Sequence, residues 1–221
     1  MSAPAEKTGH QQRQRTGQGR KSLALAAALS FGTLGVAAAP AVAAESIVFN
    51  LQVSPGAAPC LPNAKGRVTI TNNGGLAENL HVEVYNLKPN TDYDLFLIQV
   101  PNAPFGLSWY QGDIETDAHG LGVGDFVGRF SVETFIVAPG SATVPRPVHP
   151  KDAHAGTLNP AIPAPIHTYH MGVWFNSPTD AAAVGCPNTT TPFNGDHTAG
   201  IQVLNTGAFA PDRGPLFSFR P

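Results

Sequence analysis

The sequence predicts an all-β fold for residues 45–221, and three observations support this prediction. Short segments in which apolar and polar residues alternate recur along the chain, and such alternation is typical of strands with one buried face. The chain contains 23 glycines and 21 prolines, which separate these segments as turns. No segment after residue 45 sustains the 3.6-residue period of an amphipathic helix.

The predicted strands follow one another closely along the chain. Residues 46–53 are rich in β-branched and aromatic side chains, which favour strands. Residues 66–71 and 80–85 alternate strictly between apolar and polar side chains, so each is predicted to bury one face. A fourth strand, 92–100, follows a short turn. The remaining predicted strands are 126–137, 166–175 and 199–206.

The first 44 residues carry the three parts of a secretory signal peptide. Residues 1–21 hold five basic side chains and one acid, 22–44 are uncharged and rich in Ala and Leu, and small residues precede Glu45. We predict cleavage after Ala44, with Ala43 as the alternative. A membrane anchor is the other interpretation of 22–44, but Ser, Thr, Gly and Pro dilute its apolar character. The predicted product is a secreted, extracellular protein without a membrane anchor.

Removal of the signal peptide makes the protein acidic. The chain has 13 Lys and Arg against 15 Asp and Glu; residues 45–221 keep 8 and 14 of these, a formal charge of −6. Nucleic acid is not an expected partner, because phosphates require clustered cations. The remaining 177 residues suffice for one domain with a sizeable core. We predict a single β-sandwich domain over 45–221, with 139–165 as a long proline-rich loop.

Cys60 and Cys186 are the two cysteines of the chain. In an exported protein an even pair most simply forms a disulfide. A metal site or a catalytic thiol is the alternative, but the chain has no Cys-x-x-Cys spacing. The sequence therefore predicts a Cys60–Cys186 disulfide.

A corner motif lies between two of the predicted strands. Residues 87–93 read Leu-Lys-Pro-Asn-Thr-Asp-Tyr, and this Leu-x-Pro-x-Thr-x-Tyr string resembles the corner that joins two strands in fibronectin type III and related immunoglobulin-like sandwiches. In those domains the tyrosine hydroxyl bonds nearby backbone. The resemblance covers about residues 78–138. It implies that Tyr93 is the corner tyrosine, that Leu87 packs beneath it and that Pro89 supplies the turn.

The resemblance implies an immunoglobulin-like β-sandwich, and we predict this fold with an elaborated, proline-rich second half. Two features depart from the family pattern: too little chain separates 66–73 from 79–86 for the usual intervening strands, and 139–221 has no counterpart. The family implies a scaffold for adhesion or presentation, without catalysis. We therefore expect a non-catalytic protein with an extracellular binding or structural role. Its partner would be an unidentified extracellular ligand or a cell-surface component.

Three acidic residues form the first candidate metal site. Asp113, Glu115 and Asp117 are spaced two residues apart, so on a strand their three carboxylates would share one face, and such oxygen clusters suit calcium. The calcium-loop pattern is not matched, because Ala118 and Gly124 stand where Gly and Glu belong. A solvated acidic strand edge is the alternative interpretation.

Histidines provide the second candidate metal site, for zinc or copper. His167 and His170 lie three residues apart on a predicted strand, so they face opposite sides and cannot both bind one ion from regular structure. Scattered surface histidines, with one packed in the core, are the alternative. A secreted metal-binding protein or metal-dependent enzyme is therefore a rival function. The five candidate ligands are His149, His154, His167, His170 and His197.

Aromatic and glycine-rich segments complete the candidates. Trp109 and Tyr110 could form a ligand-stacking platform, which makes a carbohydrate-binding module a further alternative, although tryptophan in a small β protein is often core. Burial is the favoured interpretation of Trp174. The glycines between 120 and 128 nearly match a phosphate-binding loop, but no helix is predicted after them, so a closely packed strand is favoured.

Overall fold

A computed structural model describes three segments of the chain, 45–137, 165–191 and 198–221. The chain divides into two units, Met1–Ala41 and Val42–Pro221, and every described residue belongs to the second. The predicted signal peptide and nearly all of the predicted proline-rich loop lie outside the described residues.

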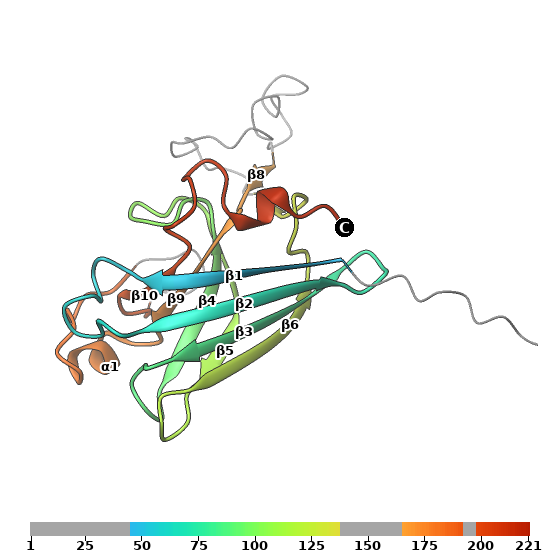
Figure 1. The fold of residues 1–221 in the computed structure, drawn as a ribbon. Coiled ribbons are helices and arrows are strands. Elements are labelled where there is room, and N and C mark those ends of the chain that lie inside the picture. Colours follow the sequence, from blue (N-terminus) through green and yellow to red (C-terminus); the bar gives the residue numbers. More distant parts are fainter. Residues whose placement is uncertain (1–44, 138–164, 192–197) are drawn as a thin grey trace, which may run out of the picture. The chain divides into compact units, whose positions relative to one another are not determined.

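Eight strands form one antiparallel sheet in the order β5-β4-β9-β10-β1-β2-β3-β6 (Figure 1). Their bounds are β1 Ser46–Val53, β2 Lys65–Asn72, β3 Glu78–Tyr85, β4 Asp92–Ile98, β5 Ser108–Glu115, β6 Gly122–Gly128, β9 His170–Phe175 and β10 Gln202–Asn205. A separate pair joins β7 (Phe135–Ile136) to β8 (Ile166–His167). The described segments also contain a short helix α1 (Pro178–Ala182) and a 3-10 helix η2 (Pro215–Ser218). The prediction of an all-β fold is confirmed.

The sheet folds over so that two four-stranded halves face each other in a sandwich-like arrangement. Strands β1, β2, β3 and β6 form one half, and β4, β5, β9 and β10 form the other (Figure 1). Alternation decides which side chains lie between them: Val68 pairs with Val82 and is buried, whereas Arg67 pairs with Glu83 on the outside. One core cluster draws on both halves and includes Phe49, Leu51, Val68, Ile70, Leu80, Val82, Tyr93, Leu95, Leu97, Ile114, Met171, Val173 and Phe175.

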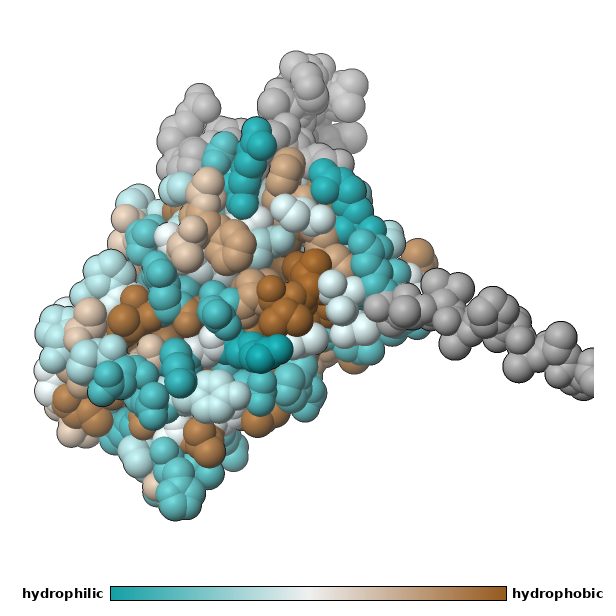
Figure 2. Space-filling model, in the orientation of Figure 1, coloured by the Kyte–Doolittle hydropathy of each residue, from teal (hydrophilic) through white to brown (hydrophobic). Residues whose placement is uncertain are grey.

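The outer faces of the two halves differ. The loop after β4 covers the outer face of β9 and β10, where the Pro101 carbonyl accepts hydrogen bonds from Gln202 and Asn205 at 3.1 Å each. Phe105 packs there against the buried ring of Trp174, so the predicted burial of Trp174 is confirmed. The outer face of β1, β2 and β3 presents mainly polar residues, and Figure 2 shows hydrophilic side chains interrupted by scattered hydrophobic ones on the side seen in Figure 1.

The two edge strands, β5 and β6, meet along a seam. A tight turn connects them, and an isolated bridge pairs Thr116 with Gly122. Further along, the ring of Phe126 lies between the strands, where a Cβ on either Gly112 or Gly124 would come within 2.6 Å of it. Gly122, Gly124 and Gly128 therefore belong to a closely packed strand, as the favoured interpretation of that segment has it, whereas Gly120 lies in the turn before it.

The predicted corner forms where β3 leads into β4. The backbone N–H of Lys88 donates to the Tyr93 hydroxyl at 2.9 Å, and Leu87 is buried in the same core cluster as Tyr93. Burial raises the pKa of the Tyr93 hydroxyl. The hydrogen bond to the Tyr93 hydroxyl is of the kind implied for a corner tyrosine, and Pro89 lies in the turn between the strands. Membership of the immunoglobulin-like family stays a prediction.

The predicted disulfide also forms. Cys60, in the loop between β1 and β2, is bonded to Cys186, which follows α1, and their Cα atoms lie 5.2 Å apart. The Ser177 hydroxyl caps α1 by accepting from the Asp180 N–H at 3.1 Å. Lys88 Nζ lies 2.8 Å from Asp180 Oδ1, which ties the helix to the corner. We call this part of the molecule the corner end: the Tyr93 corner, the disulfide, α1 and the Thr116–Gly122 bridge.

Two predicted strands are interrupted. The predicted strand 126–137 is wrong in its middle, because the buried Glu78 carboxylate accepts from the Phe130 N–H at 2.6 Å and the chain then turns at Ser131 and Thr134. The predicted strand 166–175 is likewise divided into β8 and β9. Between them the Thr168 N–H donates to the Thr134 carbonyl at 3.1 Å instead of joining the main sheet.

Candidate ligand-binding groove

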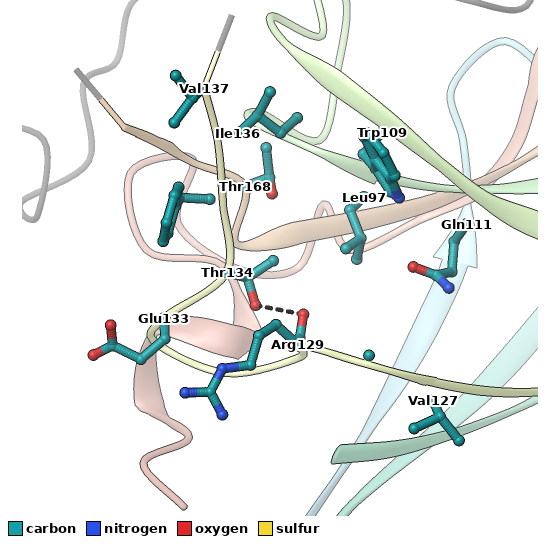
Figure 3. A pocket seen from close by; sticks show the side chains of 12 residues that line it. Leu97, Trp109, Gln111, Val127, Arg129, Glu133, Thr134, Ile136, Val137 and Thr168 are labelled. Carbon is teal, nitrogen blue, oxygen red and sulfur yellow. Dashed lines mark hydrogen bonds between the residues drawn. The ribbon is translucent and has the colours of Figure 1, made fainter. Parts of the chain in front are cut away.

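A groove of about 530 Å³ opens at the end of the seam opposite the corner end. Strand β5 forms one wall, and the end of β6 with the segment up to β7 forms the other (Figure 3). We call it the seam groove. Its lining residues are Leu97, Trp109, Gln111, Val127, Gly128, Arg129, Glu133, Thr134, Phe135, Ile136, Val137 and Thr168.

Trp109 supplies the aromatic surface of the seam groove. It pairs with the core residue Leu97, so it occupies the core-facing side of β5. Because β6 diverges from β5 here, no strand of the described chain covers the indole, and Trp109 is 58% exposed. A core-facing position is thus opened to solvent at one end of the sheet.

Tyr110 does not share this site, although the sequence groups it with Trp109. Its ring packs edge-on against Phe96 on the opposite side of β4 and β5, with ring centroids 5.6 Å apart. Its hydroxyl donates to Asp113 Oδ1 at 2.7 Å. Consecutive residues of a strand point to opposite faces. Of the two residues predicted to form the ligand-stacking platform, only Trp109 therefore lies in the seam groove.

The second wall is held in place by the buried Glu78 carboxylate. Arg129 Nη1 donates to Glu78 Oε1 at 3.2 Å and to the Leu76 carbonyl at 2.7 Å. The Thr134 hydroxyl accepts from the Ser131 N–H at 2.8 Å and donates to the Arg129 carbonyl at 2.9 Å, the bond drawn in Figure 3. These bonds direct the chain away from β5 and so keep the seam groove open.

Thr168 is the unusual polar residue of the seam groove. Its side chain lies near Ile136 (Figure 3) and the residue is 1% exposed. Its hydroxyl Oγ1 is buried and has no hydrogen-bond partner in the structure of the described chain. A buried hydroxyl without a partner destabilises a protein by about 1–3 kcal/mol, so such groups are rare. Because Thr168 also lines the seam groove, its hydroxyl is a candidate hydrogen-bonding group for a bound molecule.

The rim of the seam groove is polar but carries balanced charge. Arg129 is partly exposed, and Glu133 lies on the same wall of the seam groove (Figure 3). Gln111 is half-buried, and its amide makes no hydrogen bond within the described part of the chain. The seam groove thus combines apolar surface with a few uncharged hydrogen-bonding groups, as ligand sites commonly do.

The predicted acidic calcium site is not assembled. Asp113 and Glu115 lie opposite Asp94 and Asp92 on the outer side of β5, but the strand ends at Glu115. Asp117 instead lies in the turn, where N–H groups of Leu121 and His119 donate to its carboxylate and lower its pKa. Across the described residues, no three His, Cys, Asp or Glu side chains gather as a metal site would require.

The two candidate histidine ligands in the described segments, His167 and His170, make other contacts. The ring of His167 stacks on Tyr169 with centroids 5.1 Å apart. His170 is fully buried, with Nδ1 2.8 Å from the Thr206 hydroxyl oxygen and Nε2 3.2 Å from the Pro211 carbonyl oxygen. The other three candidate ligands, His149, His154 and His197, lie outside the described residues.

Sequence reasoning singled out Trp109 but missed Thr168, Gln111 and the wall between Arg129 and Val137. Nothing in the local sequence distinguishes Thr168, because it lies within the segment 166–175 that is predicted as one continuous strand. Its position depends on the hydrogen bond to Thr134, which is 34 residues away in the chain.

Comparisons with known proteins give no further assignment. No family model, curated protein or solved structure matches this chain. Among the described residues, no helix has the length and apolar character needed to span a bilayer.

Proposed function

We propose that this chain is an exported, non-catalytic binding protein whose ligand lies in the seam groove. The observation that carries the proposal is the exposure of Trp109, a core-facing residue of β5 left uncovered above a concave surface. Exposed aromatic surface at a groove is typical of interaction sites. The partner would be an extracellular ligand or a cell-surface component.

Two further features support export and the absence of catalysis. The leader sequence and the Cys60–Cys186 disulfide favour an oxidising, extracytoplasmic compartment. Within the described segments the seam groove brings together one carboxylate, Glu133, and one guanidinium, Arg129, without a histidine or cysteine. Such a lining favours holding a ligand over transforming it.

Trp109 also provides the test. Of the two tryptophans, Trp174 is fully buried, so quenching of fluorescence by acrylamide reports on Trp109. The purified protein would be titrated with neutral oligosaccharides, a casein peptide digest and laurate. We expect one of these probe classes to shield Trp109 from acrylamide and to raise Tm.

Neighbouring residues supply matched variants. Trp109→Ala should weaken binding of the active probe about tenfold, because an aromatic contact contributes roughly 1 kcal/mol beyond its buried area. Tyr110→Ala removes an aromatic side chain from the other face of β5 and should leave affinity unchanged. Equal loss in both variants, or no shielding by any probe, would show that the seam groove is not the binding site.

A further inference from the structure

Resting on the proposed binding function, we infer that the ligand is an uncharged sugar residue of a glycan. The sugar would lie against the Trp109 ring, with its hydroxyl groups directed at Thr168 and Gln111. The inference depends on three properties of the seam groove: a buried hydroxyl without a partner in the described chain, an exposed aromatic ring and a rim without an uncompensated positive charge.

The Thr168 hydroxyl favours a ligand that carries hydroxyl groups over a purely aliphatic one. The residue is 1% exposed and its Oγ1 has no partner within the described chain. An acyl chain filling the seam groove would offer this hydroxyl no donor or acceptor and would leave it unsatisfied, as it is in the unliganded protein. A ligand hydroxyl can both accept from Oγ1 and donate to it, so it satisfies the group completely.

The apolar surface requires a ligand that is not polar throughout. Trp109 exposes more than half of its surface, and Leu97, Val127 and Ile136 line the seam groove beneath and beside it. A pyranose ring has C–H groups on one face and hydroxyls around its edge. The C–H face can pack on the indole of Trp109, while the hydroxyls reach Thr168 and the amide of Gln111. One sugar therefore contacts both the apolar and the polar residues that line the seam groove.

Charge selects an uncharged sugar over an acidic one. The Arg129 guanidinium already contacts Glu78 Oε1 and the Leu76 carbonyl, and the Glu133 carboxylate lies on the same wall. A uronate or sulfated sugar would meet no uncompensated cation there, and residues 45–221 carry a formal charge of −6. Anionic glycans are therefore disfavoured.

The experiment compares three probe types and three variants, Thr168→Val, Thr168→Ser and Trp109→Ala. Cellohexaose, maltohexaose and chitohexaose are the uncharged probes, hexagalacturonate is the acidic probe and laurate is the aliphatic probe. Affinities would be measured by calorimetry and by acrylamide shielding of Trp109. We expect at least one uncharged hexasaccharide to bind better than hexagalacturonate and laurate.

Thr168→Val should move affinity and stability in opposite directions. Loss of the ligand hydrogen bond should weaken hexasaccharide binding roughly fivefold to tenfold. The same change replaces an unsatisfied buried hydroxyl by a methyl group and should raise the Tm of the unliganded protein. Thr168→Ser keeps the hydroxyl and should retain most of the affinity, although it lowers Tm by removing a buried methyl group.

The outcomes separate this inference from the proposed function. If laurate or hexagalacturonate binds best and Trp109→Ala abolishes that binding, the uncharged sugar is excluded while the seam groove remains the site. If a hexasaccharide binds equally to wild type, Trp109→Ala and Thr168→Val, both the inference and the proposed site are wrong. If no hexasaccharide binds, the sugar assignment is wrong.

Discussion

The seam between β5 and β6 is built differently at its two ends. At the corner end the Thr116 hydroxyl donates to the Lys88 carbonyl at 2.7 Å and accepts from the Thr91 N–H at 3.0 Å, and its backbone bridges to Gly122. At the seam groove Trp109 is exposed and the Thr168 hydroxyl has no partner within the described chain. The same two strands therefore stabilise the fold at one end and present a surface at the other.

Backbone geometry explains the tight closure of the corner end. Gly120 adopts a positive φ of 73°, and a Cβ there would lie 2.2 Å from the Leu87 carbonyl oxygen. Glycine is therefore required for the turn to approach the corner this closely. At the other end the Glu78 carboxylate binds the chain after β6 and holds it apart from β5. Strands β5 and β6 therefore lie close together at the corner end and diverge at the seam groove.

The largest effect is expected from the disulfide of the corner end. Replacing Cys60 and Cys186 together by Ala should lower the free energy of unfolding by up to about 4–5 kcal/mol, because the cross-link closes a long loop in the unfolded chain. The sequence separation is 126 residues. Urea unfolding of the double variant and of the oxidised wild type measures the difference. An unchanged midpoint would show that the corner end does not depend on the cross-link.

A smaller loss is expected from Tyr93→Phe. The variant leaves the Lys88 N–H without its acceptor and should destabilise the protein by about 1–2 kcal/mol. Trp109→Phe, a comparable change at the seam groove, should alter stability by less than about 0.5 kcal/mol, as for most exposed positions. Thermal unfolding of both variants tests the contrast. Equal losses would remove the distinction between a stabilising end and a presenting end.

The smallest effect concerns pH. The hydrogen bond from Lys88, followed by that from Ser177, holds the pKa of the Asp180 carboxyl below its ordinary value of 3.8. A lowered pKa contributes stability above that ordinary value, and the contribution disappears as the pH falls through the lowered pKa. The Asp180 side chain is 36% exposed, so the contribution should stay below about 1 kcal/mol.

Asp180→Asn tests this contribution directly. Between about pH 5 and pH 2 the wild type should lose more stability than Asp180→Asn, because the variant has no carboxylate to protonate. Glu115→Gln, which neutralises an exposed carboxylate at the end of β5, is the matched control and should behave like wild type. Identical pH profiles for wild type and Asp180→Asn would mean that the contact with Lys88 does not stabilise the corner end.

Local patterns were sufficient for the corner end. Strands β2 and β3 follow from strict alternation, since Val68 and Val82 meet in the core while Arg67 and Glu83 meet outside. Tyr93 lies five residues from the backbone group it contacts, so a short motif contains both partners. The disulfide followed from the presence of two cysteines in a chain for which the sequence predicts a signal peptide.

The seam groove was not predictable in the same way. Strand β5 escaped detection because the register shifts near Gln111, where Leu95 pairs with Gly112 and Phe96 with Tyr110, and this breaks the alternation. The acidic residues were expected to share a face, but the strand ends before Asp117. A groove between strand edges depends on how far the edges diverge, which no local pattern specifies.

The ring of Phe126, which lies between the edge strands, has a consequence for sequence variation. A Cβ at Gly112 on β5 or at Gly124 on β6 would come within 2.6 Å of this ring. Gly112 also has a φ of 152°, which disfavours any side chain at that position. Positions 124 and 126 are therefore expected to covary in homologous chains, because a larger residue at 124 requires a smaller one at 126. Each such exchange would change the width of the opening beside it.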